Sequence, residues 1–354
     1  MSGLVAYPIQ IGYYRVLREL GEGGMGTVYL AEDNRLDCRI ALKILRVRKD
    51  EGAKAVDRFY REAQLAQSVQ HPYICPVYEV GQLDGLHYLT MPFIEGTPLN
   101  QLISPESPWP EQRAAKVVRR VALALEALHQ RQVLHRDLKP HNIMLRHNDE
   151  PMVMDLGLAR SLEDAHPRLT TPGKTVGTPA YMPPELITGD ASTLGPTADV
   201  YSLGVIFYEL LTGHLPFNAT NVMALFYQIL SVLPPSATSV RPGLNEALVS
   251  ICMRAMAKSP AHRFPRMAEM AEALNEYLQQ LPDSFPPTLS PSLVRHSLRE
   301  EQPNTPGPAE QLAVQTTETP TVVPQTVGGY DLGDKIARGG MGSVYKARHR
   351  ETGQ

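Results

Sequence analysis

The sequence predicts an α+β fold of two lobes, in which a small antiparallel β-sheet with one helix precedes a larger, mainly helical lobe. Apolar and polar residues alternate with the period of a half-buried strand in several segments between residues 14 and 91. Beyond Gly96 the apolar residues recur instead at helical spacing. A third observation limits the folded region, because nine of the 31 prolines lie between residues 282 and 328, where no period is sustained.

The β-rich lobe is expected to contain one helix among its strands. This helix should span residues 53–70, because Phe59, Ala63 and Ala66 recur at helical spacing. A turn at Asn34–Asp37 should join two of the strands as a hairpin. The expected strands are 14–20, 27–32, 39–45, 74–80 and 86–91.

The second lobe is expected to hold the longer helices, over residues 114–130, 198–212, 244–257 and 267–281. Its most apolar runs, Val121–Leu128 and Val200–Leu211, are short and carry Glu126 and Glu209. A membrane helix needs about 20 apolar residues, so we expect no membrane span. The first ten residues, MSGLVAYPIQ, lack the charged and apolar regions of a secretory signal.

Charge and cysteine content exclude several classes of protein. The 34 Lys and Arg against 37 Asp and Glu give a net charge of −3, which offers no basic surface for nucleic acid. Cys38, Cys75 and Cys252 are widely spaced and form no CxxC pair or zinc-ligand pattern. A reduced, cytoplasmic chain is therefore expected.

The end of the chain repeats its beginning. Residues 330–354 match residues 14–38 at a constant offset of 316, with eight identities in 25 ungapped positions. We therefore expect a truncated start of a second domain, equivalent to the first glycine-containing hairpin. The expected organisation is an N-terminal extension at 1–13, one two-lobed domain at 14–281 with lobes of about 14–95 and 96–281, a Pro/Ser/Thr-rich disordered linker at 282–328, and the second start at 329–354.

A glycine motif lies between the first two expected strands. Residues 21–26, GEGGMG, fit the spacing GxGxxG, which is weakly specific alone. A dinucleotide-binding fold needs a helix directly after the glycines, whereas the following TVYLAE alternates as a strand. Two interpretations remain from these residues, an ordinary hairpin turn and a flap whose backbone amides close over phosphates.

The most specific pattern follows the helix expected at 114–130. The run HRDLKPHN brings Asp137, Lys139 and Asn142 together, and Asp155 follows in DLG. These groups can position a hydroxyl, neutralise phosphate charge and hold Mg²⁺ through oxygen ligands. A polar loop without function is the alternative, but it leaves the order of these residue types unexplained.

One lysine upstream needs a partner. Lys43 lies in the apolar strand IALKIL, where a buried charge is costly unless it is paired. Glu62, on the helix expected at 53–70, is the candidate partner.

Taken in order, the glycine motif, IALK, Glu62, HRDLKPHN, DLG and PPE (Pro183-Pro184-Glu185) resemble the signature set of the protein kinases. GGMGTVY and HRDLKPHNIM are similar to the bacterial Hanks-type, or eukaryotic-like, serine/threonine kinases. The resemblance covers about residues 14–281 and implies the two-lobed protein-kinase fold, with ATP and Mg²⁺, or Mn²⁺ in its place. Leu156 and Pro183 depart from the usual Phe and Ala, but neither departure removes a catalytic group.

The resemblance also implies roles for individual residues. Lys43 would contact the α- and β-phosphates and pair with Glu62, while Asp137 would accept or orient the substrate hydroxyl. Lys139 would neutralise the γ-phosphate. Asn142 and Asp155 would bind the metal. The implied ATP-binding residues are Leu20, Gly21, Gly23, Gly24, Gly26, Val28, Ala41, Lys43, Met91, Pro92, Ile94 and Met144.

In the implied adenine site Met91 is the gatekeeper, and Pro92, Phe93 and Ile94 form the hinge. Many relatives have Glu where this chain has Pro92, but that position contributes its carbonyl, which proline retains. The amide that adenine needs belongs to Ile94. The substitution should therefore not block ATP.

An activation segment is implied between DLG and PPE. Arg136 would bind the phosphorylated form of this segment, in which Thr170, Thr171 and Thr175 are the candidate acceptors. We expect autophosphorylation at Thr171 or Thr175, with unmodified threonines in a polar loop as the alternative. Thr178 and the lysine of HRDLK resemble serine/threonine rather than tyrosine kinases.

Three further residues favour a protein substrate. Glu185 should pair with a buried Arg263, and Asp199 should cap the helix expected at 198–212. Kinases of small molecules lack this closure of the activation segment.

We therefore expect a serine/threonine protein kinase with a signalling role, acting on protein substrates and on itself. A signalling scaffold, with a kinase fold that binds partners and a proline-rich tail that recruits them, is the alternative from another class. A small-molecule kinase is the third hypothesis. The sequence names no physiological substrate, activating signal or oligomeric state.

Overall fold

The computed structural model describes residues 9–23, 26–45, 52–83, 85–155, 179–189 and 194–280, together with the backbone of 326–327, 330–339 and 342–349. For several residues at the start of the first helix, and for Glu62, only the backbone is described. The chain divides into two compact units, Met1–Pro286 and Pro287–Gln354.

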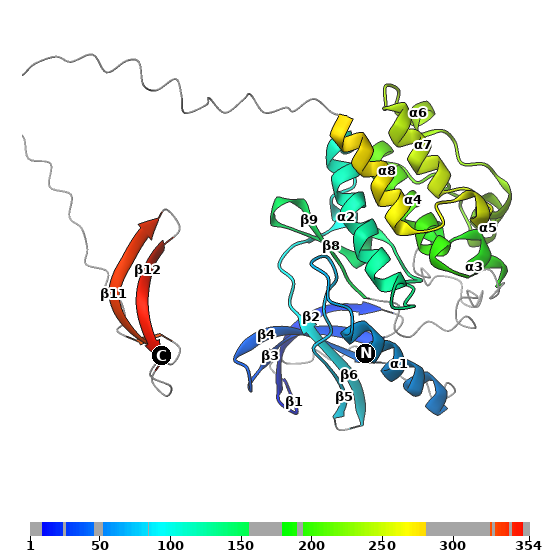
Figure 1. Ribbon diagram of the computed structural model, residues 1–354. Helices are drawn as coiled ribbons and strands as arrows, with labels where there is room; N and C mark the ends of the chain where they lie inside the picture. Colours follow the sequence, from blue (N-terminus) through cyan, green and yellow to red (C-terminus); the bar gives the residue numbers. More distant parts are fainter. Residues whose placement is uncertain are drawn as a thin grey trace, which may run out of the picture. The chain divides into compact units, whose positions relative to one another are not determined.

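Six strands of the first unit form one antiparallel sheet in the order β1-β2-β3-β4-β6-β5 (Figure 1). The expected turn at Asn34–Asp37 is confirmed, because the amides of Leu36 and Asp37 donate to the carbonyl of Asp33. The strands are β1 (Ile9–Ile11), β2 (Tyr14–Gly23), β3 (Gly26–Asp33), β4 (Cys38–Leu45), β5 (Glu79–Leu83) and β6 (Leu86–Pro92).

The strand expected at 74–80 is wrong over most of its length, since β5 begins only at Glu79. The preceding residues bond to the other lobe instead. The amide of Cys75 donates to the carbonyl of Val153 at 2.9 Å, and the amide of Val153 donates to Tyr73 at 2.8 Å. The start of the expected strand therefore pairs with a distant strand, and bonding inside the sheet begins at Tyr78, whose amide donates to the carbonyl of Thr90 at 2.8 Å.

The two faces of the six-stranded sheet pack against different apolar clusters. Ile40 and Leu42 on β4 belong to a small outer apolar cluster, whereas Ala41 between them belongs to the main core. Because successive side chains of a strand point to opposite faces, Lys43 shares the face of Ala41. The helix α1 (Gly52–Gln67) also contributes to this main core, through Phe59, Ala63 and Ala66.

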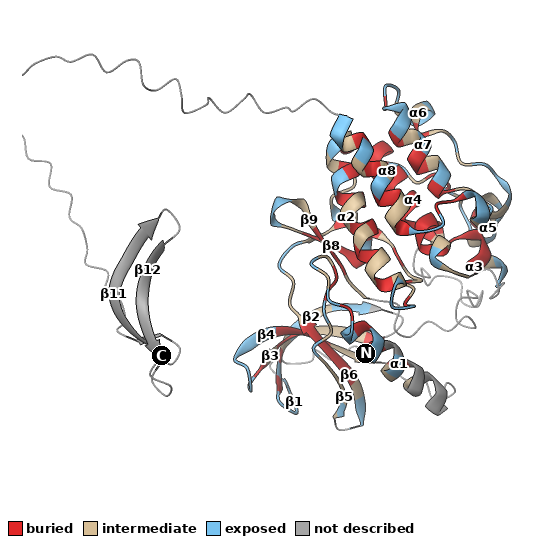
Figure 2. Ribbon diagram, in the orientation of Figure 1, coloured by how far each residue is buried: buried red, intermediate tan, exposed pale blue. Residues whose placement is uncertain are grey.

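The helical lobe is built around α4, which is buried along most of its length and packs against α2 and α7 (Figure 2). Pro196 at its first turn and Gly213 just past its end, with φ of +75°, fix its limits. The helices are α2 (Glu111–His129), α3 (Pro184–Thr188), α4 (Pro196–Thr212), α5 (Val222–Ser231), α6 (Ala237–Val240), α7 (Glu246–Ala255) and α8 (Met267–Gln280).

Three short strands form a second sheet, and two of them lie next to the HRDLKPHN and DLG motifs in the sequence. β7 (Thr97–Pro98), β8 (Ile143–Arg146) and β9 (Glu150–Val153) form an antiparallel sheet in that order. The β8–β9 hairpin lies between HRDLKPHN and DLG in the sequence. It therefore brings the ends of these two motifs together.

Trp109, the one tryptophan of the chain, lies just before α2 and is 2 % exposed. Its indole nitrogen donates to the carbonyl of Leu102 at 2.8 Å, and the guanidinium of Arg113 lies 3.9 Å from its ring centroid. Arg241 donates to the carbonyl of Trp109 itself. The indole is thus fixed within the helical lobe.

In the second unit, β10 (Thr326–Val327), β11 (Tyr330–Gly339) and β12 (Gly342–His349) form a sheet of their own. The bounds of β11 and β12 are those of β2 and β3 shifted by 316 residues. The register repeats too, since Gly339 opposes Gly342 as Gly23 opposes Gly26. Strand β10 begins inside the segment expected as a linker, just as β1 lies in the expected N-terminal extension.

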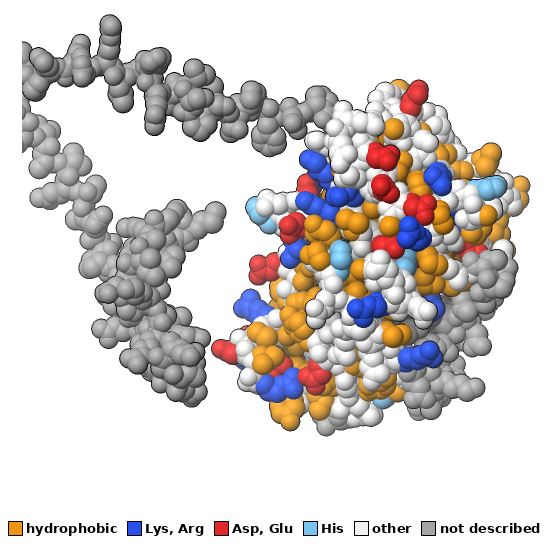
Figure 3. Space-filling model, viewed as in Figure 1, with side chains coloured by type: hydrophobic (Ala, Val, Ile, Leu, Met, Phe, Trp, Pro, Cys, Tyr) orange, Lys and Arg blue, Asp and Glu red, His pale blue; other side chains and the backbone are white. Residues whose placement is uncertain are grey.

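Among the described residues, no helix combines the length and the apolar character needed to cross a bilayer. On the face of the described region drawn in Figure 3, basic and acidic side chains are interspersed.

Candidate active site

The glycine motif forms the tip of the β2–β3 hairpin, where Gly23 pairs with Gly26. Gly26 has a φ of +149°, and a Cβ added there would lie 2.0 Å from the carbonyl oxygen of Ile44 on β4. A glycine is therefore required at this position. At Gly21, in contrast, an added Cβ would meet nothing within 4 Å. Gly24 lies outside the described residues.

The residues expected to surround adenine come together in one apolar cluster. Ala41 and Met91 are cross-strand partners on β4 and β6, and each is 5 % exposed. Pro92 ends β6 opposite Ile40. Leu20, Val28, Ile94 and Met144 are partly buried and pack against the same cluster.

Lys43 points toward the helical lobe, where its Nζ donates to Oδ1 of Asp155 at 2.7 Å. The lysine side chain is 11 % exposed and that of Asp155 is 37 % exposed, so water reaches the pair from the carboxylate side. Burial acts to raise the pKa of Asp155, but the charge and hydrogen bond of Lys43 outweigh it and hold the pKa below its usual value. Asp155 therefore stays ionised at neutral pH.

Glu62, the partner expected for Lys43, lies on the described part of α1, but its side chain lies outside the described residues. The contact of Lys43 with Asp155 was not anticipated from the sequence. The sequence did indicate that Lys43 needs a carboxylate partner, and Asp155 meets this need as Glu62 would.

The HRDLKPHN loop folds so that its polar side chains converge on Asp137. Nζ of Lys139 donates to Oδ2 of Asp137 at 2.8 Å. The amide nitrogen of Asn142 donates to the backbone carbonyl of Asp137 at 2.8 Å. The carbonyl of Asn142 in turn accepts from the amide of Met154, which places the loop beside the residue before Asp155.

Two residues of this region have left-handed backbone conformations that are unusual for side chains other than glycine. The φ of Arg136 is +59° and that of Asp155 is +49°. Such conformations cost about 1–3 kcal/mol each and persist only where the surroundings enforce them. Both residues belong to the functional motifs.

Asp199 on α4 supplies that enforcement for the HRD loop. Its carboxylate accepts hydrogen bonds from the amides of His135 at 2.9 Å and Arg136 at 3.0 Å, and it lies 2.7 Å from Nε2 of His129. Burial raises its pKa, but the bond with His129 and the charges of both histidines outweigh burial and lower it. The buried ring of His135 lies within hydrogen-bond distance of the carbonyl of Met154, consistent with packing rather than acid–base chemistry.

The expectation that Asp199 caps its helix is wrong. Helix α4 begins at Pro196, after Gly195, so Asp199 already lies within the first turn. Because its carboxylate is turned to the HRD loop, its role is to hold that loop. A carboxylate in an otherwise largely apolar helix was the signal that could have indicated this role.

Glu185 and Arg263 form the expected buried pair. Two parallel bonds of 2.6 and 2.9 Å join the guanidinium and the carboxylate, and the side chains are 0 % and 4 % exposed. The pair joins α3, directly after the expected activation segment, to the segment before α8. Leu156, Thr170, Thr171, Thr175 and Thr178 lie outside the described residues.

Comparisons with known proteins agree with this geometry. A model of the protein kinase domain family matches residues 14–276. The serine/threonine-protein kinase PrkC of Bacillus subtilis is 36 % identical over 73 % of this chain and 39 % of its own length. PknD of Mycobacterium tuberculosis is 39 % identical over 76 % of this chain and 40 % of its own length. The chain thus spans about two fifths of the length of these relatives.

Solved structures show the same fold. The crystal structure of the Mycobacterium tuberculosis PknI kinase domain superimposes with a TM-score of 0.61 at 29 % identity. It covers 77 % of this chain and 99 % of its own. With the family model covering residues 14–276, the two-lobed fold and the serine/threonine kinase relatives, the chain belongs to the protein kinase family, in its bacterial eukaryotic-like serine/threonine branch.

Proposed function

We propose that this chain is a serine/threonine protein kinase that transfers the γ-phosphoryl group of ATP to hydroxyls of proteins. The observation that carries the proposal is the approach of Lys43 to Asp155, at 2.7 Å, from positions 112 residues apart in the sequence. This contact brings a cation for phosphate and an ionised carboxylate for a metal to one place, beside the Asp137 loop. Few other chemistries need this combination.

The described residues suit a magnesium ion. Mg²⁺ prefers oxygen ligands such as carboxylates, and Asp155 is kept ionised by Lys43. Asn142 is held through its amide nitrogen, which leaves its amide oxygen as the atom able to ligate. When bound, Mg²⁺ or Mn²⁺ would offset the charge of the phosphates.

The residues of the chain then act mainly by position and charge. Asp137 orients the substrate hydroxyl and accepts its proton, and Lys139, bonded to the same carboxylate, offsets charge on the transferred group. Lys43 contacts the α- and β-phosphates. Ala41, Val28, Leu20 and Met144 enclose adenine in this proposal, because they pack against one apolar cluster.

The substitutions Asp137→Asn and Lys43→Met test this function in the full chain. Each should abolish transfer of labelled phosphate to a generic protein substrate while the circular dichroism spectrum stays unchanged. Lys116→Met, on the exposed side of α2, is the matched control and should retain activity. Transfer that persists in either site variant would overturn the assignment.

Further parts of the proposal concern regulation and location. We propose autophosphorylation at Thr171 or Thr175, with Arg136 as the binding partner of the phosphate, and phosphopeptide mapping after incubation with ATP tests it. A cytoplasmic location is supported by the free thiols of Cys38, Cys75 and Cys252.

The second hairpin is proposed to belong to another kinase-like domain. Its support is the repetition of strand bounds and register at an offset of 316 residues.

A further inference from the structure

Among the described side chains of helix α1, one large ring and two small residues are buried in the main core. Its buried apolar side chains are Phe59, Ala63 and Ala66, each no more than 2 % exposed. Helices are normally fixed by large side chains that interlock with their neighbours. Phe59 provides such interlocking at one point, but the two alanines provide little of it, so the polar contacts of α1 also matter for its position.

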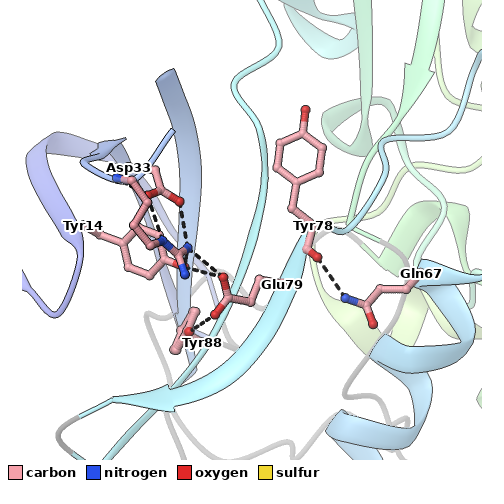
Figure 4. A network of polar contacts seen from close by, with 7 residues as sticks. Tyr14, Asp33, Gln67, Tyr78, Glu79 and Tyr88 are labelled. Carbon is pink, nitrogen blue, oxygen red and sulfur yellow. Dashed lines mark hydrogen bonds and ion pairs between the residues drawn. The ribbon is translucent and has the colours of Figure 1, made fainter. Parts of the chain in front are cut away.

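Two such contacts are described. The hydroxyl of Tyr60 lies 3.0 Å from Nδ1 of His87, and the two rings meet edge-on with centroids 5.7 Å apart. At the last residue of the helix, the amide nitrogen of Gln67 donates to the carbonyl of Tyr78 at 3.1 Å (Figure 4). Tyr60 and Gln67 are seven residues apart, which is about two helical turns, or roughly 10 Å along the axis. Two contacts this far apart define both the position and the rotation of the helix.

The acceptor strand of the second contact is itself held firmly. Glu79, directly after Tyr78, accepts hydrogen bonds from the hydroxyls of Tyr14 at 3.0 Å and Tyr88 at 2.7 Å. Arg35 donates to the same carboxylate at 2.8 Å (Figure 4). The start of β5 is therefore tied to β2, to β6 and to the turn between β3 and β4, which makes it a fixed support for Gln67.

The contact of Tyr60 with His87 has a particular place relative to the proposed site. His87 lies on β6 two residues before Leu89, the cross-strand partner of Lys43 on β4. Residues two apart on a strand share a face, so His87 and Lys43 lie on the same face of the sheet. Tyr60 lies two residues before Glu62 on α1. The contact thus joins α1, which carries Glu62, to β6, the strand that pairs with the Lys43 strand β4.

We propose that Tyr60, held by His87, is a positioning residue for phosphoryl transfer, which sets the placement of α1, and with it Glu62, relative to Lys43. This inference rests on the proposed kinase function. The loss of the hydroxyl removes one of the two polar contacts described above for α1 without removing the apolar packing of Phe59, Ala63 and Ala66.

Tyr60→Phe in the full chain is the test, with Tyr78→Phe as the matched control. Tyr78 is 54 % exposed, and the substitution keeps the backbone carbonyl that Gln67 uses. We expect Tyr60→Phe to lower kcat about three- to ten-fold, the usual worth of one hydrogen bond, with KM for the protein substrate unchanged. The melting temperature should stay near that of the wild type, and Tyr78→Phe should match the wild type in all three measurements.

A double-mutant cycle with His87→Phe identifies the partner. If the two side chains act as a unit, the double variant should be no slower than either single variant. An unchanged kcat in Tyr60→Phe, an equal loss in Tyr78→Phe, or additive losses in the cycle would each overturn the inference. A wild-type chain that transfers no phosphate would overturn the proposed function itself.

Discussion

Neutralising Glu185 should remove a large share of the stability of the helical lobe. Arg263 is fully buried and donates all five of its N–H groups, two of them to Glu185 and the others to the carbonyls of Ala257, Thr197 and Lys258. Glu185→Gln keeps the shape of the side chain but leaves the guanidinium without its counter-charge. Removing one partner of a buried pair costs about 3–5 kcal/mol. Since domains are stable by only about 5–15 kcal/mol, the expected loss is a large fraction of the total.

Urea unfolding of the full chain at neutral pH, followed by far-ultraviolet circular dichroism, measures this loss. The control is Glu269→Gln, because Glu269 forms an exposed pair with Arg266 at 3.4 Å, with side chains 37 % and 66 % exposed. Exposed pairs contribute about 0–1 kcal/mol, so the control should unfold almost as the wild type does. A loss below about 1 kcal/mol in Glu185→Gln would refute the reasoning that a buried, fully bonded pair behaves differently from an exposed one.

Two further predictions concern the glycine hairpin and the HRD loop. Gly26→Ala should displace β4 at a cost on the order of 2 kcal/mol and lower the melting temperature, whereas Gly21→Ala, with no protein atom within 4 Å of the added Cβ, should match the wild type in melting temperature. Equal effects of the two substitutions would contradict the steric argument. Asp199→Asn should lower the free energy of unfolding at pH 7 by about 2–3 kcal/mol, since the carboxylate holds the His135 and Arg136 amides. Because the pKa of Asp199 is lowered from 3.8 by folding, this contribution is complete above that value and is lost as pH falls through the folded pKa. Thermal unfolding of both proteins across the acid range checks this, and a difference independent of pH would count against it.

The sequence was most informative where chemistry depends on neighbours in the chain. The convergence of Lys139 and Asn142 on Asp137 follows from their spacing within one loop, and the structure brings them together as expected. The pair of Glu185 with Arg263, which are distant in the chain, was also predicted, but that prediction rested on the resemblance to the protein kinases.

It was least informative where the result depends on how the two lobes meet. The segment at 74–78 alternates like a strand, yet at its start the amide of Cys75 donates to the carbonyl of Val153, about 80 residues later in the chain. Lys43 demanded a buried carboxylate, but the choice of Asp155 is made by the approach of the β8–β9 hairpin. Local periodicity contains no information on which distant segment will lie beside residue 75 or beside Lys43.

Asp199 illustrates a conflict between two local rules. An acidic residue near the start of a helix usually indicates a cap, and Asp199 fits that pattern. Proline at the first turn moved the start of α4 to Pro196, so the carboxylate became available to another part of the chain. Which rule prevails is decided by the tertiary contacts of His129, His135 and Arg136.

The position of Trp109 has a spectroscopic consequence. Because it is the one indole of the chain and is buried in the helical lobe, its emission spectrum reports on that lobe alone. Tyr14 and Tyr88, by contrast, are buried in the β-sheet lobe, with ring centroids 5.4 Å apart. Excitation selective for tryptophan therefore separates melting of the helices from melting of the sheet, with no label attached to either lobe.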